Sequence, residues 1–346
     1  MPLTPSDVQD LLITTQRDLG ELRFTQIAQE LPYYEVFSKW FRRDKVQFDS
    51  GTSIQRTLMT SYDSDSAGHV GYLDSDQVNI GDHLTTMNVP WVHFRTSWGI
   101  IFQTDILMNR GRALILNILK PRRTAALIGM VQELENKAFG SPPSSSNKTD
   151  PWGLQYWVVP NATAGFNGGA PSGNTTVAGV DLTAHQTFKN YTDRYVSITK
   201  GDAITKMRDA WRSIRFRSPV TIQDYRGAMG DRYRIYVPKG VIRAFEDTGE
   251  GQNENLGRDI AEMDGSITFR RNPIVWIPKL DERTDDPIYM INHSTFRPVC
   301  LKGDYLRESE PKESPGQHNA FMVFVDLTYN FLNEDRRGNA VLNTSG

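Results

Sequence analysis

A stretch without basic residues limits most strongly what this chain can fold into. Lys and Arg number 39 among the 346 residues, yet none occurs from Thr57 to Phe94. The stretch contains five aspartates and three glycines: Asp63, Asp65, Asp74, Asp76, Asp82, Gly68, Gly71 and Gly81. With strand-like runs on both sides, it predicts a long, acidic, extended hairpin that buries little against its own domain. Because loops of this length are commonly functional or disordered, the pattern indicates packing on a neighbouring molecule rather than catalysis.

The two arms of the hairpin are predicted from hydrophobic alternation. The first arm consists of Val46, Phe48 and then Ile54–Met59. In the return arm, apolar residues alternate with a period of two, as is typical of a strand: Met87, Val89, Trp91 and Phe94. Residues 61–83 form the tip. The run from Asp63 to Asp74 resembles a calcium-binding loop, but Ala67 stands at its fifth position and Asp rather than Glu at its twelfth. A solvated or partner-facing acidic tip is the better interpretation.

Composition narrows the class of protein. The length suits two domains or one elaborated domain, and 38% hydrophobic with 23% charged residues is typical of a soluble, folded chain. A net charge of −2 argues against a protein that holds nucleic acid by overall basicity. We find neither a secretory leader nor an apolar run near the ~20 residues that a membrane span needs. We therefore expect an intracellular chain without a membrane partner.

No pattern of catalytic or ligand-binding residues stands out. The six histidines form no zinc spacing, and neither a nucleophile-elbow nor a phosphate-loop motif is present. Cys300, the single cysteine, is expected to be a buried small hydrophobe, and His93 a structural histidine of a strand. The glycine-rich run 165–179 lacks the Lys of a phosphate cradle, which favours a flexible surface loop. We expect no enzyme activity, no catalytic residues, no cofactor and no metal site.

The remaining periodicity predicts interleaved helices and strands. A capped helix begins near Thr4, and the longest helical candidate runs from Thr104 to Phe139, with a kink or two abutting helices at Pro121. A second helix opens at 200–202. Strands are predicted at 233–237, 274–278, 287–291 and 321–331, a short helix around 241–246, and a polar loop at 303–319. Because the segments do not form regular βαβ units, the fold class is α+β.

Five basic residues lie at the start of the long helix and around its proline: Arg110, Arg112, Lys120, Arg122 and Arg123. One interpretation is a solvated helix face. The other is a docking site for an acidic partner, for which the acidic hairpin of a neighbouring copy is the obvious candidate. The second interpretation predicts contacts between subunits, made by Asp63, Asp65, Asp74, Asp76 and Asp82 on one copy and Arg110, Arg112, Arg122 and Arg123 on the next.

In the order of its elements, the chain resembles the major capsid proteins of tailed bacteriophages, which have the Hong Kong 97-type capsid fold. The resemblance covers nearly the whole chain and is carried by loose motifs: WGLQYWVVP at 152–160, KGDAITKMRDAWRSI at 200–214, RYRIYVPKGVIRAFED at 232–247, RNPIVWIPKL at 271–280, PIYMINHSTFRPV at 287–299 and AFMVFVDLTYNF at 320–331. It implies an N-terminal arm (1–45), an E-loop (46–102), a peripheral domain with a long spine helix (103–199), an axial domain (200–318) and a return strand with a C-terminal tail (319–346).

The resemblance also implies a function. Copies would self-assemble into hexamers and pentamers of an icosahedral shell that loosely encloses double-stranded DNA, with portal, scaffolding or decoration proteins as candidate partners. The chain would be assembled in the host cytoplasm and reside in the virion. We can match no Lys and Asn to the cross-linking pair of some members, so covalent cross-linking is not carried over from the family.

Two alternatives stay open. The family also includes shells of cellular nanocompartments and gene-transfer particles, which the fold does not exclude. From a different class, a β-rich carbohydrate- or receptor-binding protein would use Trp152, Tyr156, Trp157 and Trp276 as aromatic platforms.

Overall fold

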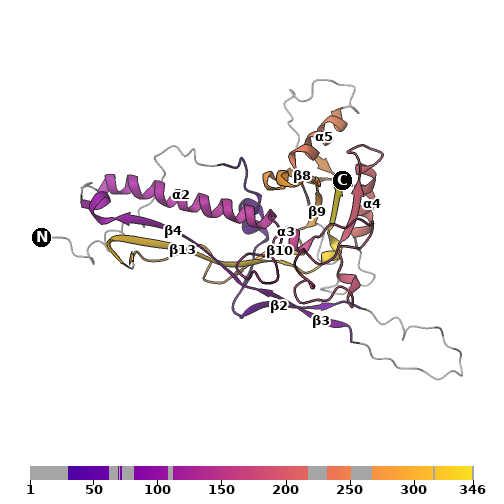
Figure 1. The fold of residues 1–346 in the computed structure, drawn as a ribbon, viewed down its shortest axis with the longest axis horizontal. Helices are drawn as coiled ribbons and strands as arrows, with labels where there is room; N and C mark the ends of the chain where they lie inside the picture. Colours follow the sequence, from indigo (N-terminus) through magenta and orange to yellow (C-terminus); the bar gives the residue numbers. More distant parts are fainter. Residues whose placement is uncertain are drawn as a thin grey trace. The chain divides into compact units, whose positions relative to one another are not determined.

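The computed structural model (Figure 1) describes residues 30–61, 69, 71, 82–107, 112–216, 232–250, 267–314 and 316–344. The chain forms two compact units. The first takes its described residues from Met1–Ser50, Val92–Asn136 and Val299–Tyr329, and the second from Gly51–Trp91, Lys137–Pro298 and Asn330–Gly346. Helices and strands are interleaved along the chain, as the α+β prediction requires. The helix predicted at Thr4 lies outside the described residues.

A six-stranded sheet organises the first unit. Four strands follow in the order β1 (Val46–Phe48), β10 (Phe296–Leu301), β13 (Gln317–Asn333) and β11 (Arg307–Glu308), and β13 also pairs with β4 (Val92–Ile101) and β12 (Lys312–Ser314). Side chains of a strand alternate between the two faces. The β4 and β13 pairs Trp98↔Val323 and Ile100↔Phe321 are therefore buried, whereas His93↔Thr328 and Arg95↔Asp326 lie on the opposite face.

The long helix α2 (Arg112–Phe139) runs lengthwise beside β4 and β13 (Figure 1). Its buried residues include Met130, Leu134 and Ala138, which follow one another at helical spacing on one face. Pro121 lies inside one continuous helix, so the alternative prediction of two abutting helices is wrong. The helix also starts later than predicted, because the segment Phe102–Leu107 forms a separate short helical element, η2. Packing of the apolar face therefore outweighs the local cost of proline in a helix.

A short N-terminal helical element, η1 (Val36–Asp44), also belongs to the first unit. Val36, Trp40 and Phe41 are buried. The ring of Phe41 lies 5.7 Å from that of Tyr329 in an edge-to-face arrangement and 6.3 Å from that of Tyr305. This short element is thus held by aromatic contacts, which contribute beyond simple burial.

The second unit is built on another six-stranded sheet. Its strands follow in the order β5 (Tyr191–Tyr195), β14 (Ala340–Thr344), β9 (Ile288–Asn292), β6 (Tyr233–Val237), β8 (Asn272–Trp276) and β7 (Thr268–Phe269). The helices are α3 (Leu154–Trp157), α4 (Ala203–Ile214) and α5 (Lys239–Glu250), with short turns η3 (Gln186–Phe188), η5 (Pro278–Glu282) and η6 (Arg336–Gly338). Met207 and Trp211 of α4 pack with Tyr233 and Ile235 of β6 in one core. The predicted helix after residues 200–202 is confirmed.

A two-stranded antiparallel hairpin, β2 (Ser53–Met59) with β3 (Leu84–Pro90), belongs to the second unit. The prediction of two pairing arms is confirmed, but both arms are shorter than expected. Val46 and Phe48 instead pair in parallel with Val299 and Leu301 of β10, so β1 adds an edge strand to the sheet of the first unit. Phe94 likewise lies in β4 rather than in the return arm. Hydrophobic alternation marks a strand without indicating its partner, which explains both errors.

Two segments predicted as loops have more structure than expected. The polar run 303–319 includes β11 and β12, which both pair with β13. The glycine-rich run 165–179 is not a loose surface loop, because Val177 and Ala178 are buried. Gly168 packs so closely on Asn190 that an added Cβ would lie 1.9 Å from the Oδ1 atom of Asn190. Gly168 therefore permits close packing on Asn190 within the second unit.

The side chain of Arg336 ties these irregular segments together. Arg336 is fully buried, and its guanidinium donates to the carbonyl oxygens of Trp157 (2.6 Å), Phe188 (3.3 Å) and Gly169 (3.0 Å) and to Oδ1 of Asn190 (3.1 Å). None of these four acceptors is a carboxylate. Burial lowers the pKa of Arg336 to about 9, so the group stays charged at neutral pH. A planar fork of donors suits this geometry, and a lysine cannot reproduce it.

We expect Arg336→Met to lower the free energy of unfolding of the unassembled chain by at least about 3 kcal/mol, since it leaves several buried acceptors without a donor. Urea unfolding measures this change. Arg212→Met is the matched control, because the Arg212 side chain is 69% exposed and its pair with Asp209 is worth at most about 1 kcal/mol. Equal unfolding midpoints for the two variants would contradict the assigned role.

Candidate interaction site

The two faces of the β2/β3 hairpin differ in burial. Ile54 pairs with Val89, Arg56 with Met87, and Leu58 with Thr85 on one face. Ile54, Met87 and Val89 are fully buried there. This face therefore packs on the hairpin's own unit. The expectation that the hairpin buries little surface against its own domain is wrong for the described arms.

The opposite face of the hairpin carries no charged side chain along the ladder from Ser53↔Pro90 to Met59↔Leu84. Gln55, Thr57, Thr86 and Asn88 are exposed and uncharged. At the far end of the ladder, Met59 is 62% exposed and its partner Leu84 is 61% exposed. Depletion of charge with exposed large apolar side chains is typical of a protein interface. We call these residues the neutral face.

The prediction of a docking surface rested on the charge of the acidic tip and did not include the neutral face of the arms. The signal was present: Met59 and Leu84 occupy the outward positions of the period-two pattern, where solvent-facing side chains are normally polar. Arg56, the single charged residue of the two strands, lies on the buried face and pairs with Glu334 at 3.1 Å.

Most of the predicted acidic residues lie outside the described residues, namely Asp63, Asp65, Asp74 and Asp76, and so does the calcium-like loop that they contain. Asp82 is described: it is exposed, and its Oδ1 atom accepts from the backbone N–H of Leu84 at 3.2 Å. Asp82 therefore lies where the tip joins β3.

The predicted basic residues are partly engaged within their own unit. Arg122 makes a bidentate ion pair with Asp105 and donates to the Gly99 carbonyl at 3.0 Å. Arg123 pairs with Glu308, with an Nε–Oε1 distance of 2.8 Å. Arg110 lies outside the described residues, as does the side chain of Arg112. Arg122 and Arg123 thus already have carboxylate partners, which a docking acid would have to share.

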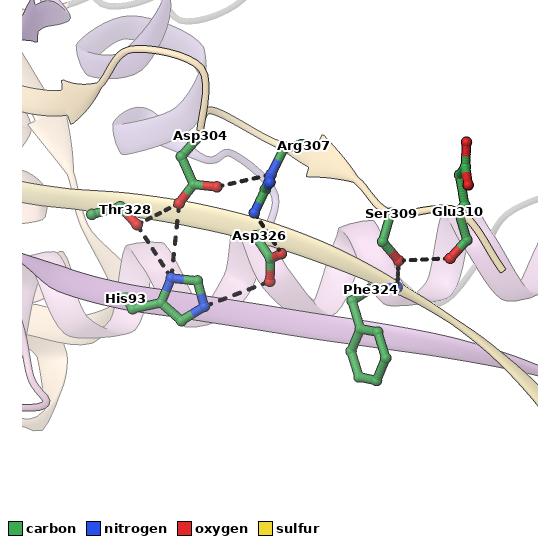
Figure 2. A network of polar contacts seen from close by, with 8 residues as sticks. All are labelled: His93, Asp304, Arg307, Ser309, Glu310, Phe324, Asp326 and Thr328. Carbon is green, nitrogen blue, oxygen red and sulfur yellow. Dashed lines mark hydrogen bonds and ion pairs between the residues drawn. The ribbon is translucent and has the colours of Figure 1, made fainter. Parts of the chain in front are cut away.

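A polar network covers the outer face of the β4/β13 pair (Figure 2). His93 lies between two carboxylates, with Nε2 3.5 Å from Asp326 and Nδ1 3.8 Å from Asp304. Arg307 also contacts both carboxylates, at 3.0 Å and 3.3 Å. Thr328 lies 3.2 Å from His93 Nδ1. His93 therefore has polar partners, as expected of a structural histidine, but its side chain is 54% exposed.

On the same face, Arg95 is exposed and lies opposite Asp326 in the strand register. Its side chain makes no hydrogen bond or ion pair with the described residues. Arg95 is therefore an available basic group on the first unit, and the prediction from charge clustering missed it because it stands alone in a strand.

Glu135 of α2 holds the beginning of η1. Its carboxylate is almost completely buried and accepts from the backbone N–H groups of Glu35 (3.2 Å) and Val36 (2.8 Å). The first N–H groups of a helix have no acceptor within it, so Glu135 serves as their cap. Burial raises the pKa of Glu135 to about 8, against the opposing effect of the Val36 N–H. Glu135 therefore links η1 to α2 by two hydrogen bonds, and it titrates at a higher pH than an ordinary glutamate.

The remaining sequence predictions concern Cys300, metal binding and membrane spans. Cys300 is buried, as expected, and burial raises the pKa of its thiol to about 12. Across the described part of the chain, no group of three His, Cys, Asp or Glu side chains is arranged to hold a metal ion. No helix within the described ranges is both long and apolar enough to cross a membrane.

Comparison with known proteins places this architecture. No protein-family model matches the sequence, and no curated protein does. Among solved structures, the capsid protein of cyanophage A-1(L) matches with a TM-score of 0.63 at 10% identity, over 96% of this chain and 98% of that chain. The chain has the fold of a phage capsid protein.

Two other capsid-fold shells are similar to this chain. The capsid of a native GTA particle matches with a TM-score of 0.54 at 11% identity, over 95% of this chain and 96% of that one. The SrpI encapsulin of Synechococcus elongatus matches with a TM-score of 0.51 at 12% identity, over 95% and 94%. The capsid fold thus extends over nearly the whole chain, and its α+β class agrees with the prediction.

The raised pKa of Glu135 predicts a pH dependence of stability. The folded-state value of about 8 lies above the ordinary value of 4.5, so the folded chain binds this proton more tightly than the unfolded chain does. The stabilisation is complete below about pH 4.5 and is lost as the pH rises towards 8. The unfolding temperature of Glu135→Gln should therefore fall less steeply between pH 5 and pH 8 than that of the wild type. Glu133→Gln, a half-buried neighbour on α2, is the control and should keep the wild-type slope.

Proposed function

We propose that this chain is a major capsid protein whose copies assemble into the hexamers and pentamers of an icosahedral shell around double-stranded DNA. The observation that carries the proposal is a capsid fold along nearly the full chain, combined with an exposed, charge-free hairpin face that suits contact with another copy. The similar solved structures are shell proteins rather than enzymes, which supports a structural role.

The finer assignments belong to the same proposal. Residues 1–45 serve as the N-terminal arm, 46–102 as the E-loop, 103–199 as the peripheral domain with α2 as its spine helix, 200–318 as the axial domain and 319–346 as the return strand and tail. Contact with packaged DNA is loose and non-specific, since the net charge is −2. Assembly takes place in the host cytoplasm, and portal, scaffolding or decoration proteins are further partners.

Two surfaces of the hairpin contribute to docking in this proposal. The neutral face supplies apolar contact through Met59 and Leu84. The acidic tip, with Asp63, Asp65, Asp74, Asp76 and Asp82, faces basic groups of an adjacent copy. Arg110 and Arg112 are candidates for that role together with Arg95, and Arg122 and Arg123 would share charge already used for Asp105 and Glu308.

Purified chain is expected to form closed particles in the megadalton range. Size-exclusion chromatography followed by negative-stain electron microscopy measures this directly. A compact monomer or trimer under all conditions of salt and concentration would overturn the proposal.

The two docking surfaces can be separated by mutation. Met59→Ser with Leu84→Ser should reduce particle yield at any salt concentration, because burying each large apolar side chain is worth about 1.5–3 kcal/mol. Asp63→Lys with Asp65→Lys should have a smaller effect that fades at high salt, since exposed ion pairs are worth about 0–1 kcal/mol each. Thr57→Ser with Thr86→Ser, on the same face, is the matched control. Unchanged yield and salt dependence in the Asp variant would remove charge from the docking model.

The content of the particles distinguishes a DNA-containing capsid or gene-transfer particle from a nanocompartment. The GTA and encapsulin matches show that the same fold forms other shells. Nuclease-protected double-stranded DNA supports a capsid or gene-transfer particle, and particles that enclose protein support a nanocompartment. The carbohydrate-binding alternative is disfavoured, because Tyr156 and Trp157 are buried and Trp157 Nε1 donates to the Phe331 carbonyl at 3.1 Å.

A further inference from the structure

The hairpin arms are fixed to the second unit at several points along their length. At the base, Nδ2 of Asn330 donates to the Pro90 carbonyl at 2.7 Å, and Glu334 links Arg56 (3.1 Å) with Arg297 (2.9 Å). The backbone N–H of Asn88 donates to the Ala178 carbonyl at 2.9 Å. These contacts come from β13, from Glu334 just after it and from the glycine-rich run, which gives that run a role as a support for the hairpin.

Ala178 is held in an unusual conformation at this support. Its φ angle is +52°, in the left-handed region that non-glycine residues rarely adopt. Its N–H donates to the Tyr156 hydroxyl at 3.1 Å, and the residue is buried. The carbonyl that receives Asn88 is therefore set by packing around it rather than by local preference.

A single side chain supports the far end of the arms. The Thr187 hydroxyl, on η3, donates to the Thr60 carbonyl at 2.5 Å. Thr60 is the residue after β2, and its N–H donates to the His83 carbonyl at 3.0 Å, which closes the ladder. Thr60 is buried, whereas its neighbour Met59 is exposed. Thr187 therefore lies at the point where the two arms give way to the tip.

The position of Thr187 is itself fixed. Phe188, the next residue of η3, is buried and its carbonyl accepts from Arg336 at 3.3 Å. The Arg336 guanidinium also lies 5.5 Å from the centre of the Phe188 ring. The residue next to Thr187 is thus held by the same buried cation that contacts the glycine-rich run, so the two supports of the hairpin share one origin.

From this geometry we infer that Thr187 is a positioning residue, which fixes the direction in which the hairpin tip leaves the subunit and so controls the regularity of assembly. Beyond the Asn88 contact the ladder extends about 13 Å at about 3.3 Å per residue, so a swing of about 10° there would move its far end by about 2 Å. That displacement exceeds what a hydrogen bond or a packed interface tolerates. An anchor at the far end removes this freedom, and the inference rests on the proposed shell function.

The test compares three single variants. Thr187→Val removes the hydroxyl at nearly constant shape, Thr187→Ser restores it, and Thr183→Val is the control, because Thr183 is exposed in the same segment and its hydroxyl makes no contact with the described residues. Amide hydrogen exchange is measured on the unassembled chain over residues 57–60 and 83–87. Electron microscopy then gives the spread of particle diameters.

In Thr187→Val we expect exchange at Thr60 to be about fivefold faster, the equivalent of one hydrogen bond, together with a broader range of particle diameters. Thr187→Ser and Thr183→Val should match the wild type in both measurements. Unchanged exchange in Thr187→Val, or faster exchange with particles as uniform as those of the wild type, would overturn the inference. If the wild type forms no particles, the proposed function fails separately, and unchanged or faster exchange still decides whether Thr187 anchors the hairpin.

Discussion

The buried guanidinium of Arg336 is the constraint on which the irregular half of the second unit depends. Three backbone carbonyls from separate segments, and the Asn190 amide oxygen, converge on one cation that has no carboxylate among these acceptors. Segments without regular secondary structure cannot satisfy their own backbone groups, so they need an outside partner. One side chain with a fork of donors meets that need, and it fixes the α3 end, the glycine-rich run and η3 relative to one another within this unit.

The hairpin connects this buried region with the exposed surface of the second unit. One face of its arms packs on the second unit, where Ile54, Met87 and Val89 are buried. The other face carries no charge and ends in Met59 and Leu84, which are exposed. A long loop that packs on one side and presents the other combines a defined direction with an available surface. This division of faces agrees with a shell protein, in which each copy must meet its neighbours at a set angle.

The sequence predicted the elements better than their partners. The apolar face of α2, the α4 helix after Asp202 and the long β13 strand were evident from periodicity, since each is long and strongly patterned. The same rule could not show that Val46 and Phe48 pair with β10, because alternation carries no information about which strand lies alongside. The basic cluster was found by composition, yet Arg122 and Arg123 turned out to have Asp105 and Glu308 as partners, which lie 17 and 185 residues away along the chain.

By itself, the sequence determined the α+β class, the order of elements, the buried Cys300 and the existence of a long hairpin, because these depend on local patterns and on the chemistry of single residues. Only the tertiary structure decided which hairpin face is buried, that Thr187 meets Thr60, and that Glu135 caps η1 from 99 residues away. Such contacts depend on how separate elements are brought together. Their free energy comes from burial and from distant hydrogen-bond partners, which no window of neighbouring residues contains.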